Sequence, residues 1–139
     1  MYIINDIDYL LTLAKLLRVH ELLPAGSLAV SRLKMQQHGA IIRQQLATYH
    51  QIRHLNVDDL EAFEAWSIGK SRDLSTGDLS TVYIATKNPQ LTIVLCKDDL
   101  FLPEVCGNCA ARSKKWDDLI KEIADKRLID MYELLKNAS

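Results

Sequence analysis

Acidic residues stand just after two hydrophobic runs of this chain, where a parallel sheet would bring them together. Asp6 follows the run "YII", and Asp98 follows the run "LTIVL". Asp78 lies in "LSTGDLSTVYIA", at the capping-box spacing from Ser75, in the first turn of an expected helix. Ligands of open parallel sheets bind outside the carboxyl ends of the strands. We therefore expect Asp6, Asp78 and Asp98 to meet at one edge of a sheet.

Carboxylates that lie close together repel one another unless a cation neutralises them, and Mg²⁺ or Mn²⁺ does this with oxygen ligands. A pair of such ions activates water and stabilises the leaving oxygen in phosphodiester hydrolysis. Asp6, Asp78 and Asp98 are the candidate catalytic and metal-binding residues, with the neighbouring Asp99 as a substitute or additional ligand. Each also has a structural interpretation. Asp6 or Asp8 can cap a helix, Asp78 can complement a helix dipole, and Asp98 can belong to a turn.

The length and composition favour one globular domain over residues 1–139. The chain is 48% hydrophobic and 25% charged, with three cysteines, Cys96, Cys106 and Cys109. It contains no apolar run of about 18 residues and no basic, signal-like N-terminal segment, so we expect no membrane span and no secretion. The expected location is the cytoplasm, where the thiols stay reduced.

Basic side chains gather in one part of the sequence although the net charge is only −1. Residues 22–57 contain no acidic residue and carry Arg32, Lys34, Arg43 and Arg53. A basic face of this kind steers nucleic acids even on a neutral protein, so these four residues are candidate phosphate contacts. The alternative is a solvated helix surface.

Predicted strands alternate with predicted helices along the chain. The strands are expected at residues 2–5, 28–30, 55–57 and 91–95. The helices are expected at residues 8–22, at 31–52 with a break at Gly39, from 58 to about 66, at 75–88 and from 113 onwards. Asp8 is the expected cap of the first helix. This alternation predicts an α/β fold with a mainly parallel sheet flanked by helices.

The succession of four segments resembles the PIN-domain family, especially its small bacterial members of the toxin type. "YIINDIDYLLTLAKLLRVHELL" is similar to that family's first strand and helix, and "LSTGDLSTVYIA" to its Leu-Ser-x-(Gly/Ala)-(Asp/Glu) segment. "LTIVLCKDD" resembles its strand followed by Thr-x-Asp, with Cys96 in place of the Thr. "WDDLIKEIADKRLIDMYELLKNA" resembles the C-terminal helical segment.

The resemblance implies a three-layer PIN-like fold and a ribonuclease that depends on Mg²⁺ or Mn²⁺. Asp6 matches the family's first acid, Asp78 a later one and Asp98 the last. Family members of this size are often homodimers and toxins of toxin–antitoxin pairs. RNA, an antitoxin protein and a second copy of the chain are therefore the expected partners.

One acidic position departs from the family pattern. The Glu expected after the second strand is missing from "LAVSRLKMQQHG", where Gln36 or Gln37 stands instead. The loss of one negative charge weakens metal binding, unless Glu61 or Glu64 replaces it. The alternative function is therefore a catalytically impaired scaffold that binds RNA or a protein without cutting.

A second alternative starts from "DID" at residues 6–8. Haloacid dehalogenase-like phosphatases carry Asp-x-Asp-x-Thr after their first strand, with a nucleophilic Asp. Asp6 and Asp8 match the two acids, but Leu10 stands at the Thr position. This interpretation ranks below the ribonuclease.

Overall fold

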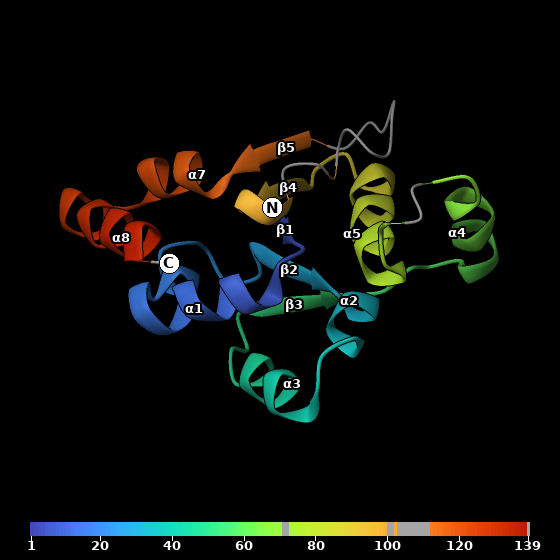
Figure 1. The fold of residues 1–139 in the computed structure, drawn as a ribbon, viewed down its shortest axis with the longest axis horizontal. Helices are drawn as coiled ribbons and strands as arrows, with labels where there is room; N and C mark the ends of the chain where they lie inside the picture. Colours follow the sequence, from blue (N-terminus) through green and yellow to red (C-terminus); the bar gives the residue numbers. More distant parts are fainter. Residues whose placement is uncertain (71–72, 100–101, 103–111, 139) are drawn as a thin grey trace.

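The fold is an α/β arrangement in which helices cover both faces of a parallel sheet (Figure 1). The computed structural model describes residues 1–70, 73–99, 102 and 112–138. The predicted fold class is confirmed. The sheet has five strands in the order β3-β2-β1-β4-β5, and every neighbouring pair is parallel. The strands are β1 (Tyr2–Ile4), β2 (Leu28–Ser31), β3 (Ile52–Leu55), β4 (Thr92–Leu95) and β5 (Arg112–Lys115).

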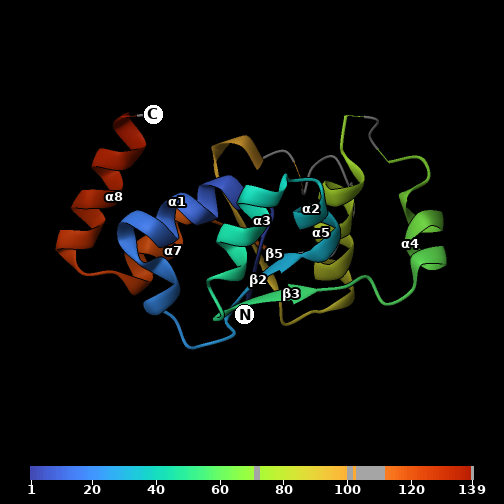
Figure 2. The same ribbon diagram turned by 90° about the horizontal axis from the view of Figure 1, so that it is seen from below.

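Two helical layers enclose this sheet. One layer contains α1 (Ile7–Leu17), α3 (Ala40–Ala47), α7 (Trp116–Ile123) and α8 (Lys126–Ala138). The other contains α4 (Leu60–Ser67) and α5 (Thr76–Lys87). The short helix α2 (Arg32–Gln36) follows β2, and the 3₁₀ turns η1 (Val19–Glu21) and η2 (Lys97–Asp99) complete the described elements. Seen from below, α8 and α4 stand at opposite ends of the molecule (Figure 2).

The central strands are buried on both faces because helices pack on each side of them. Successive residues of a strand point to opposite faces, and β1 shows the result. Ile3 packs with α5 and Ile93, whereas Ile4 packs with α1 and Val94. This explains why β1 and β4 read as continuous hydrophobic runs in the sequence.

The order of the strands creates a switch point between β1 and β4. The chain runs from β1 through β2 to β3 on one side of the sheet, and then returns to form β4 and β5 on the other side of β1. Ligands of such sheets bind at the carboxyl ends of the strands where the order reverses. Asn5 and Asp6 leave β1 at this point, and residues 96–99 leave β4 beside them.

Several predicted boundaries were wrong. The first helix begins at Ile7, one residue earlier than expected, and ends at Leu17 rather than residue 22, where a 3₁₀ turn follows it. The third strand is Ile52–Leu55 rather than residues 55–57, because the preceding helix already ends at Ala47. The helix expected from residue 113 begins at Trp116, because Arg112–Lys115 pairs with β4 as an edge strand. The polar sequence "RSKK" has no hydrophobic pattern that predicts a strand. It is extended because it pairs with β4.

Two further predictions concern cysteines and membranes. Cys106 and Cys109 lie outside the described residues. Within the described ranges, no helix combines the length and the apolar character that crossing a membrane requires.

Candidate acidic site at the ends of β1 and β4

Asp6 has two roles at the end of β1. Its backbone is extended, and its Oδ1 accepts a hydrogen bond of 3.0 Å from the backbone N–H of Tyr9, which caps α1. Its Oδ2 faces the sulfur of Cys96 at 3.4 Å. The expectation that Asp8 caps this helix was wrong. Asp8 is exposed in the first turn, where its carboxylate lies 4.0 Å from the His38 ring.

Cys96 and Asp99 complete a three-residue cluster with Asp6. The thiol of Cys96 lies 3.2 Å from Asp99 Oδ2, and both residues are buried. One ligand atom from each of Asp6, Cys96 and Asp99 lies within 4.8 Å of the other two. The 3₁₀ turn that follows β4 turns the Asp99 side chain inward, whereas the neighbouring Asp98 is exposed.

Asp78 lies next to this cluster but has a cationic partner of its own. The predicted capping box is present, since Ser75 Oγ accepts from the N–H of Asp78 and Asp78 Oδ2 accepts from the N–H of Ser75. The Nζ of Lys34 lies 2.6 Å from Asp78 Oδ1, and the exposed fractions of the two side chains are only 18% and 16%. This ion pair links α2 to α5.

Asn5 connects the two groups of acids. Its Nδ2 donates to Asp78 Oδ1 at 2.9 Å and to Asp99 Oδ1 at 3.2 Å. The residue is 3% exposed, and its Oδ1 has no hydrogen-bond partner among the described residues. A buried carbonyl oxygen without a partner is costly, so it is a candidate to accept a ligand.

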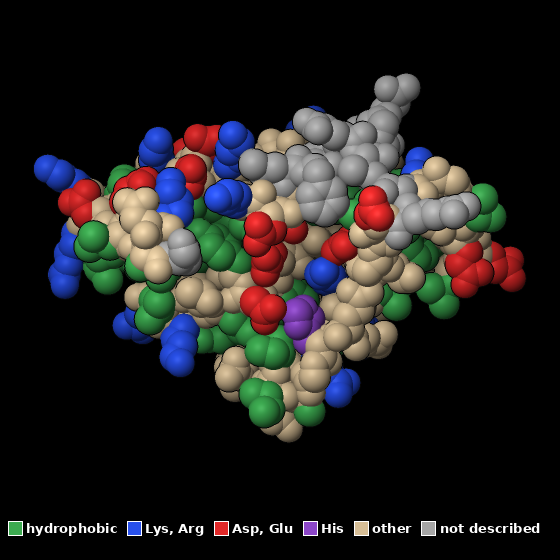
Figure 3. Space-filling view, viewed as in Figure 1, with side chains coloured by type: hydrophobic (Ala, Val, Ile, Leu, Met, Phe, Trp, Pro, Cys, Tyr) green, Lys and Arg blue, Asp and Glu red, His purple; other side chains and the backbone are tan. Residues whose placement is uncertain are grey.

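All four predicted acids line one cavity of about 240 Å³. Its lining consists of Asn5, Asp6, Ile7, Asp8, Lys34, His38, Asp78, Asp98 and Asp99. The space-filling view shows acidic side chains gathered near the centre of one face, beside a histidine and basic atoms (Figure 3). The structure therefore brings Asp6, Asp78 and Asp98 to the same cavity, while the closest cluster contains Asp99 and Cys96.

The acids of this cavity differ in their electrostatic balance. Burial raises the pKa of Asp99, and the charge of Asp6 adds to the rise, against hydrogen bonds from Cys96 and Asn5. Burial also acts to raise the pKa of Asp78, but its hydrogen bonds with Lys34 and Asn5 hold that pKa below its usual value. Negative charge is thus balanced at Asp78 but not between Asp6 and Asp99.

The thiol of Cys96 is affected by the same charges. Its burial and the neighbouring Asp99 and Asp6 carboxylates raise its pKa far above the usual value. The side chain is therefore a neutral thiol that donates to one carboxylate at a time. A bound cation would reverse this effect, because metal coordination favours the thiolate.

The donors of this cluster fit a divalent cation. The carboxylates of Asp6 and Asp99 are oxygen ligands of the kind that Mg²⁺ and Mn²⁺ prefer. The sulfur of Cys96 is a softer ligand, which shifts the preference towards Zn²⁺. The expected cofactor class therefore fits the residues present, with the thiol disfavouring Mg²⁺.

No protein-family model matches the sequence, and no curated protein or solved structure is significantly similar to it. The function therefore has to be inferred from the chemistry of the site itself.

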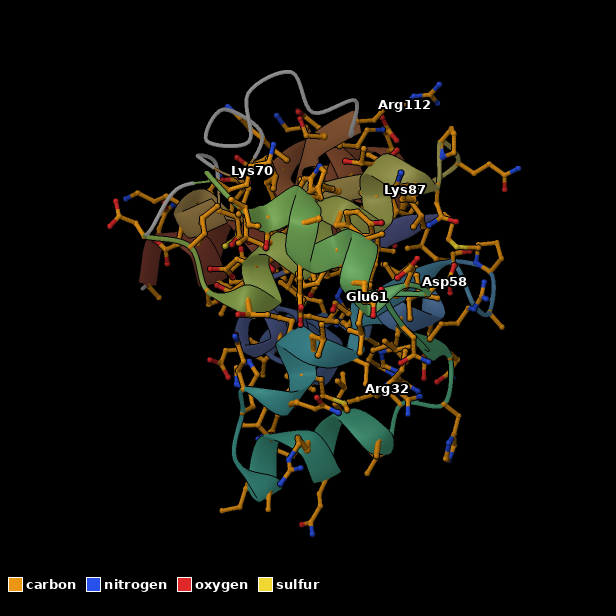
Figure 4. The ribbon with its side chains drawn as sticks, turned by 90° about the vertical axis from the view of Figure 1, so that its right-hand side faces the viewer. Arg32, Asp58, Glu61, Lys70, Lys87 and Arg112 are labelled. Carbon is orange, nitrogen blue, oxygen red and sulfur yellow. The ribbon has the colours of Figure 1, made fainter. Side chains whose placement is uncertain are left out.

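The predicted phosphate contacts do not share one location. Lys34 lines the acidic cavity, whereas Arg32, Arg43 and Arg53 are exposed and absent from its described lining. Arg53 lies on the edge strand β3 and packs its side chain towards Gly26. Figure 4 shows Arg32 on the side of the molecule that carries α4.

The missing Glu is not replaced by the residues proposed for it. Gln37 accepts a hydrogen bond of 3.2 Å from the Ser75 hydroxyl, and Gln36 is exposed. Glu61 and Glu64 are exposed on α4, which α5 separates from the sheet (Figures 1 and 4). The side chain that α2 contributes to the cavity is the cation Lys34.

Sequence reasoning did not identify Asn5 and Cys96 as site residues. A polar residue directly before Asp6 was the available signal for Asn5. For Cys96 the signal was its place directly after the run "LTIVL", beside the acidic residues Asp98 and Asp99.

Proposed function

We propose that this protein is a metal-dependent ribonuclease that hydrolyses phosphodiester bonds in the cytoplasm. The observation that carries the proposal is the cluster of Asp6, Cys96 and Asp99 at the switch point of a parallel sheet, beside an open cavity. Two unbalanced carboxylates in a mostly buried position favour binding of a divalent cation. The resemblance to PIN domains supports RNA as the substrate.

Asp6, Asp99 and Cys96 would hold the cation, and Asn5 would orient Asp99. When bound, a divalent cation supplies Lewis acidity that activates water and stabilises negative charge on phosphate oxygens. Asp98 lies exposed on the same cavity and is the candidate ligand on its open side.

Lys34 contributes a fixed positive charge to the same cavity. Asp78 holds the ammonium group at 2.6 Å, and Asn5 in turn holds Asp78. An ammonium in this position attracts a phosphate oxygen and stabilises charge that develops during cleavage. We therefore assign Lys34 to phosphate binding and Asp78 to the positioning of Lys34.

The scaffold alternative has one observation in its favour. The ion pair between Lys34 and Asp78 already neutralises one of the predicted acids. A site of this kind binds an RNA phosphate without requiring cleavage. The partners suggested by the resemblance, an antitoxin protein and a second copy of the chain, are part of either proposal.

The test is cleavage of a labelled single-stranded RNA with Mg²⁺, Mn²⁺ or Zn²⁺. Asp6→Asn is the central variant, because Asn also caps helices well and the change removes charge without removing the cap. Asp58→Asn is the matched control, since Asp58 is exposed before α4 (Figure 4). We expect the wild type and the control to cleave, and Asp6→Asn to lose at least about 100-fold in rate.

Equal cleavage by the wild type and Asp6→Asn would contradict the proposed site. RNA binding without cleavage by the wild type would support the scaffold. Hydrolysis of a small phosphomonoester that is lost in Asp6→Asn would support the phosphatase.

A further inference from the structure

A second, larger groove adjoins the acidic cavity. It has a volume of about 740 Å³ and shares Asp6 and Asp98 with that cavity. Its other lining residues come from α1, the end of β4 with η2, the junction of β5 and α7, and α8. They include Tyr9, Lys97, Lys115, Trp116, Tyr132 and Lys136. A ligand in this groove would therefore continue directly into the candidate metal site.

Lysines from three separate elements line this groove. Lys97 belongs to η2, Lys115 ends β5, and Lys136 lies on α8. Lys97 and Lys115 are exposed, and Lys136 is half-buried. Figure 3 shows basic side chains beside the central acidic group, over the part of the molecule that carries α7 and α8 in Figure 1. Elements far apart in sequence thus bring positive charge to one place.

The acidic residue that the groove does not share with the cavity has internal partners. Asp117 accepts a hydrogen bond of 2.6 Å from the Tyr132 hydroxyl and lies 3.1 Å from the Nζ of Lys136. Tyr132 and Lys136 therefore stabilise the negative charge of Asp117 within the protein. The exposed side chains of Lys97 and Lys115 are accessible to a ligand from solvent.

We propose that this groove binds the phosphodiester backbone of the single-stranded RNA segment that flanks the cleaved bond. This inference rests on the proposed ribonuclease function and names the surface that holds its substrate. Lysine charge attracts phosphates without reading bases, and the groove volume accommodates about one or two nucleotides. Its continuity with Asp6 and Asp98 favours the same polymer that is cut there.

The aromatic residues of the groove support backbone recognition over base stacking. Trp116 and Tyr132 are 1% and 2% exposed, so their faces are not free for a base. Tyr9 is half-buried, and its hydroxyl lies 3.3 Å from that of Tyr132. Tyr9 also packs against Trp116 with their ring centroids 6.3 Å apart, so these three aromatic side chains connect α1, α7 and α8. Binding should accordingly depend strongly on salt and weakly on sequence.

The basic residues predicted from the sequence are distinct from those that line the groove. Arg43 and Arg53, predicted from the sequence, lie outside the described lining of both the cavity and the groove. Arg43 belongs to α3 and Arg53 to β3, and both are exposed. They are therefore matched controls for Lys97 and Lys115, because neutralising either pair removes the same charge.

The experiment measures the affinity of the full chain for a fluorescent oligouridine of about ten nucleotides in the presence of a chelator, which prevents cleavage. We expect Lys97→Gln/Lys115→Gln to weaken binding at least about tenfold at low salt. The slope of log affinity against log salt should become shallower by about 1.4, or about 0.7 for each lost phosphate contact. Arg43→Gln/Arg53→Gln should change the affinity less than about twofold.

Equal affinities for the two double variants, or a greater loss with Arg43→Gln/Arg53→Gln, would overturn the groove proposal. So would failure of the wild type to bind the oligonucleotide. Loss of binding in the lysine variant without any cleavage by the wild type would support the groove and reject the ribonuclease. Unchanged binding and cleavage in the lysine variant, with cleavage lost in Asp6→Asn, would support the ribonuclease and reject the groove.

Discussion

Replacement of Asp99 by Asn should stabilise the metal-free protein while removing its response to metal. Ligand oxygens of Asp6 and Asp99 lie within 4.8 Å of each other. Two full charges at that separation repel by about 3 kcal/mol at an effective dielectric constant of about 20. Solvent screening at the half-buried Asp6 reduces this value, and the variant loses one hydrogen bond from Cys96 or Asn5, worth about 1 kcal/mol. We therefore expect a net gain of about 1–2 kcal/mol in the free energy of unfolding.

The assay is urea denaturation of the wild type and Asp99→Asn with a chelator, repeated with Mn²⁺. A cation at about 100 times its dissociation constant should stabilise the wild type by about 2.7 kcal/mol and the variant hardly at all. The two proteins should thus exchange their order of stability when metal is added. Asp58→Asn is the control, because Asp58 is exposed before α4, outside the described lining of the cavity, and its replacement should change stability by less than about 0.5 kcal/mol with or without metal.

A less stable Asp99→Asn in the presence of chelator would refute this reasoning. It would show that the Asp99 carboxylate is held by its hydrogen bonds with Asn5 and Cys96 for structural reasons. Equal metal responses of the wild type and Asp99→Asn would remove Asp99 from the proposed ligands.

Three further changes test the packing and chemistry around the site. Gly77→Ala should destabilise the fold by about 1–2 kcal/mol in urea denaturation, despite a better helix former. The added Cβ would lie 2.8 Å from the Cα of Lys34, and a more stable variant would contradict this close packing. Tyr132→Phe should cost about 1–2 kcal/mol at neutral pH, because it removes the hydrogen bond to Asp117. That hydrogen bond, followed by the interaction with Lys136, lowers the pKa of Asp117. The cost of Tyr132→Phe should therefore disappear as acid protonates Asp117. A cost that persists in acid would contradict a stabilising role of this hydrogen bond. Cys96→Ser should weaken Zn²⁺ binding about tenfold or more in calorimetry and change Mn²⁺ binding less, whereas unchanged Zn²⁺ binding would exclude sulfur as a ligand.

The sequence predicted the central part of the fold through local signals. The runs "YII" and "LTIVL" indicated buried parallel strands, because strands covered on both faces contain few polar residues. The capping box of Ser75 and Asp78 located the start of α5, since its hydrogen bonds join residues only three positions apart. Gly39 correctly separated α2 from α3.

Local sequence signals could not predict the edge strand β5. The strand β5 has the polar sequence "RSKK", and its extended conformation comes from pairing with β4. Edge strands expose their side chains, so their sequences do not need a hydrophobic pattern. The cap of α1 was misassigned for a different reason, because Asp6 and Asp8 are both suitable capping residues and only the backbone geometry distinguishes them.

The sequence by itself determined that acidic residues follow β1 and β4, and a parallel sheet requires the ends of such strands to lie at one edge. Only the tertiary structure decided which atoms meet there. The turn after β4 directs Asp99 inward and leaves Asp98 exposed, and α2 brings Lys34 to Asp78 across 44 positions of the chain. Asn5 reaches Asp99 across 94 positions. Contacts over such separations depend on how helices pack against the sheet, and local sequence patterns do not specify that packing.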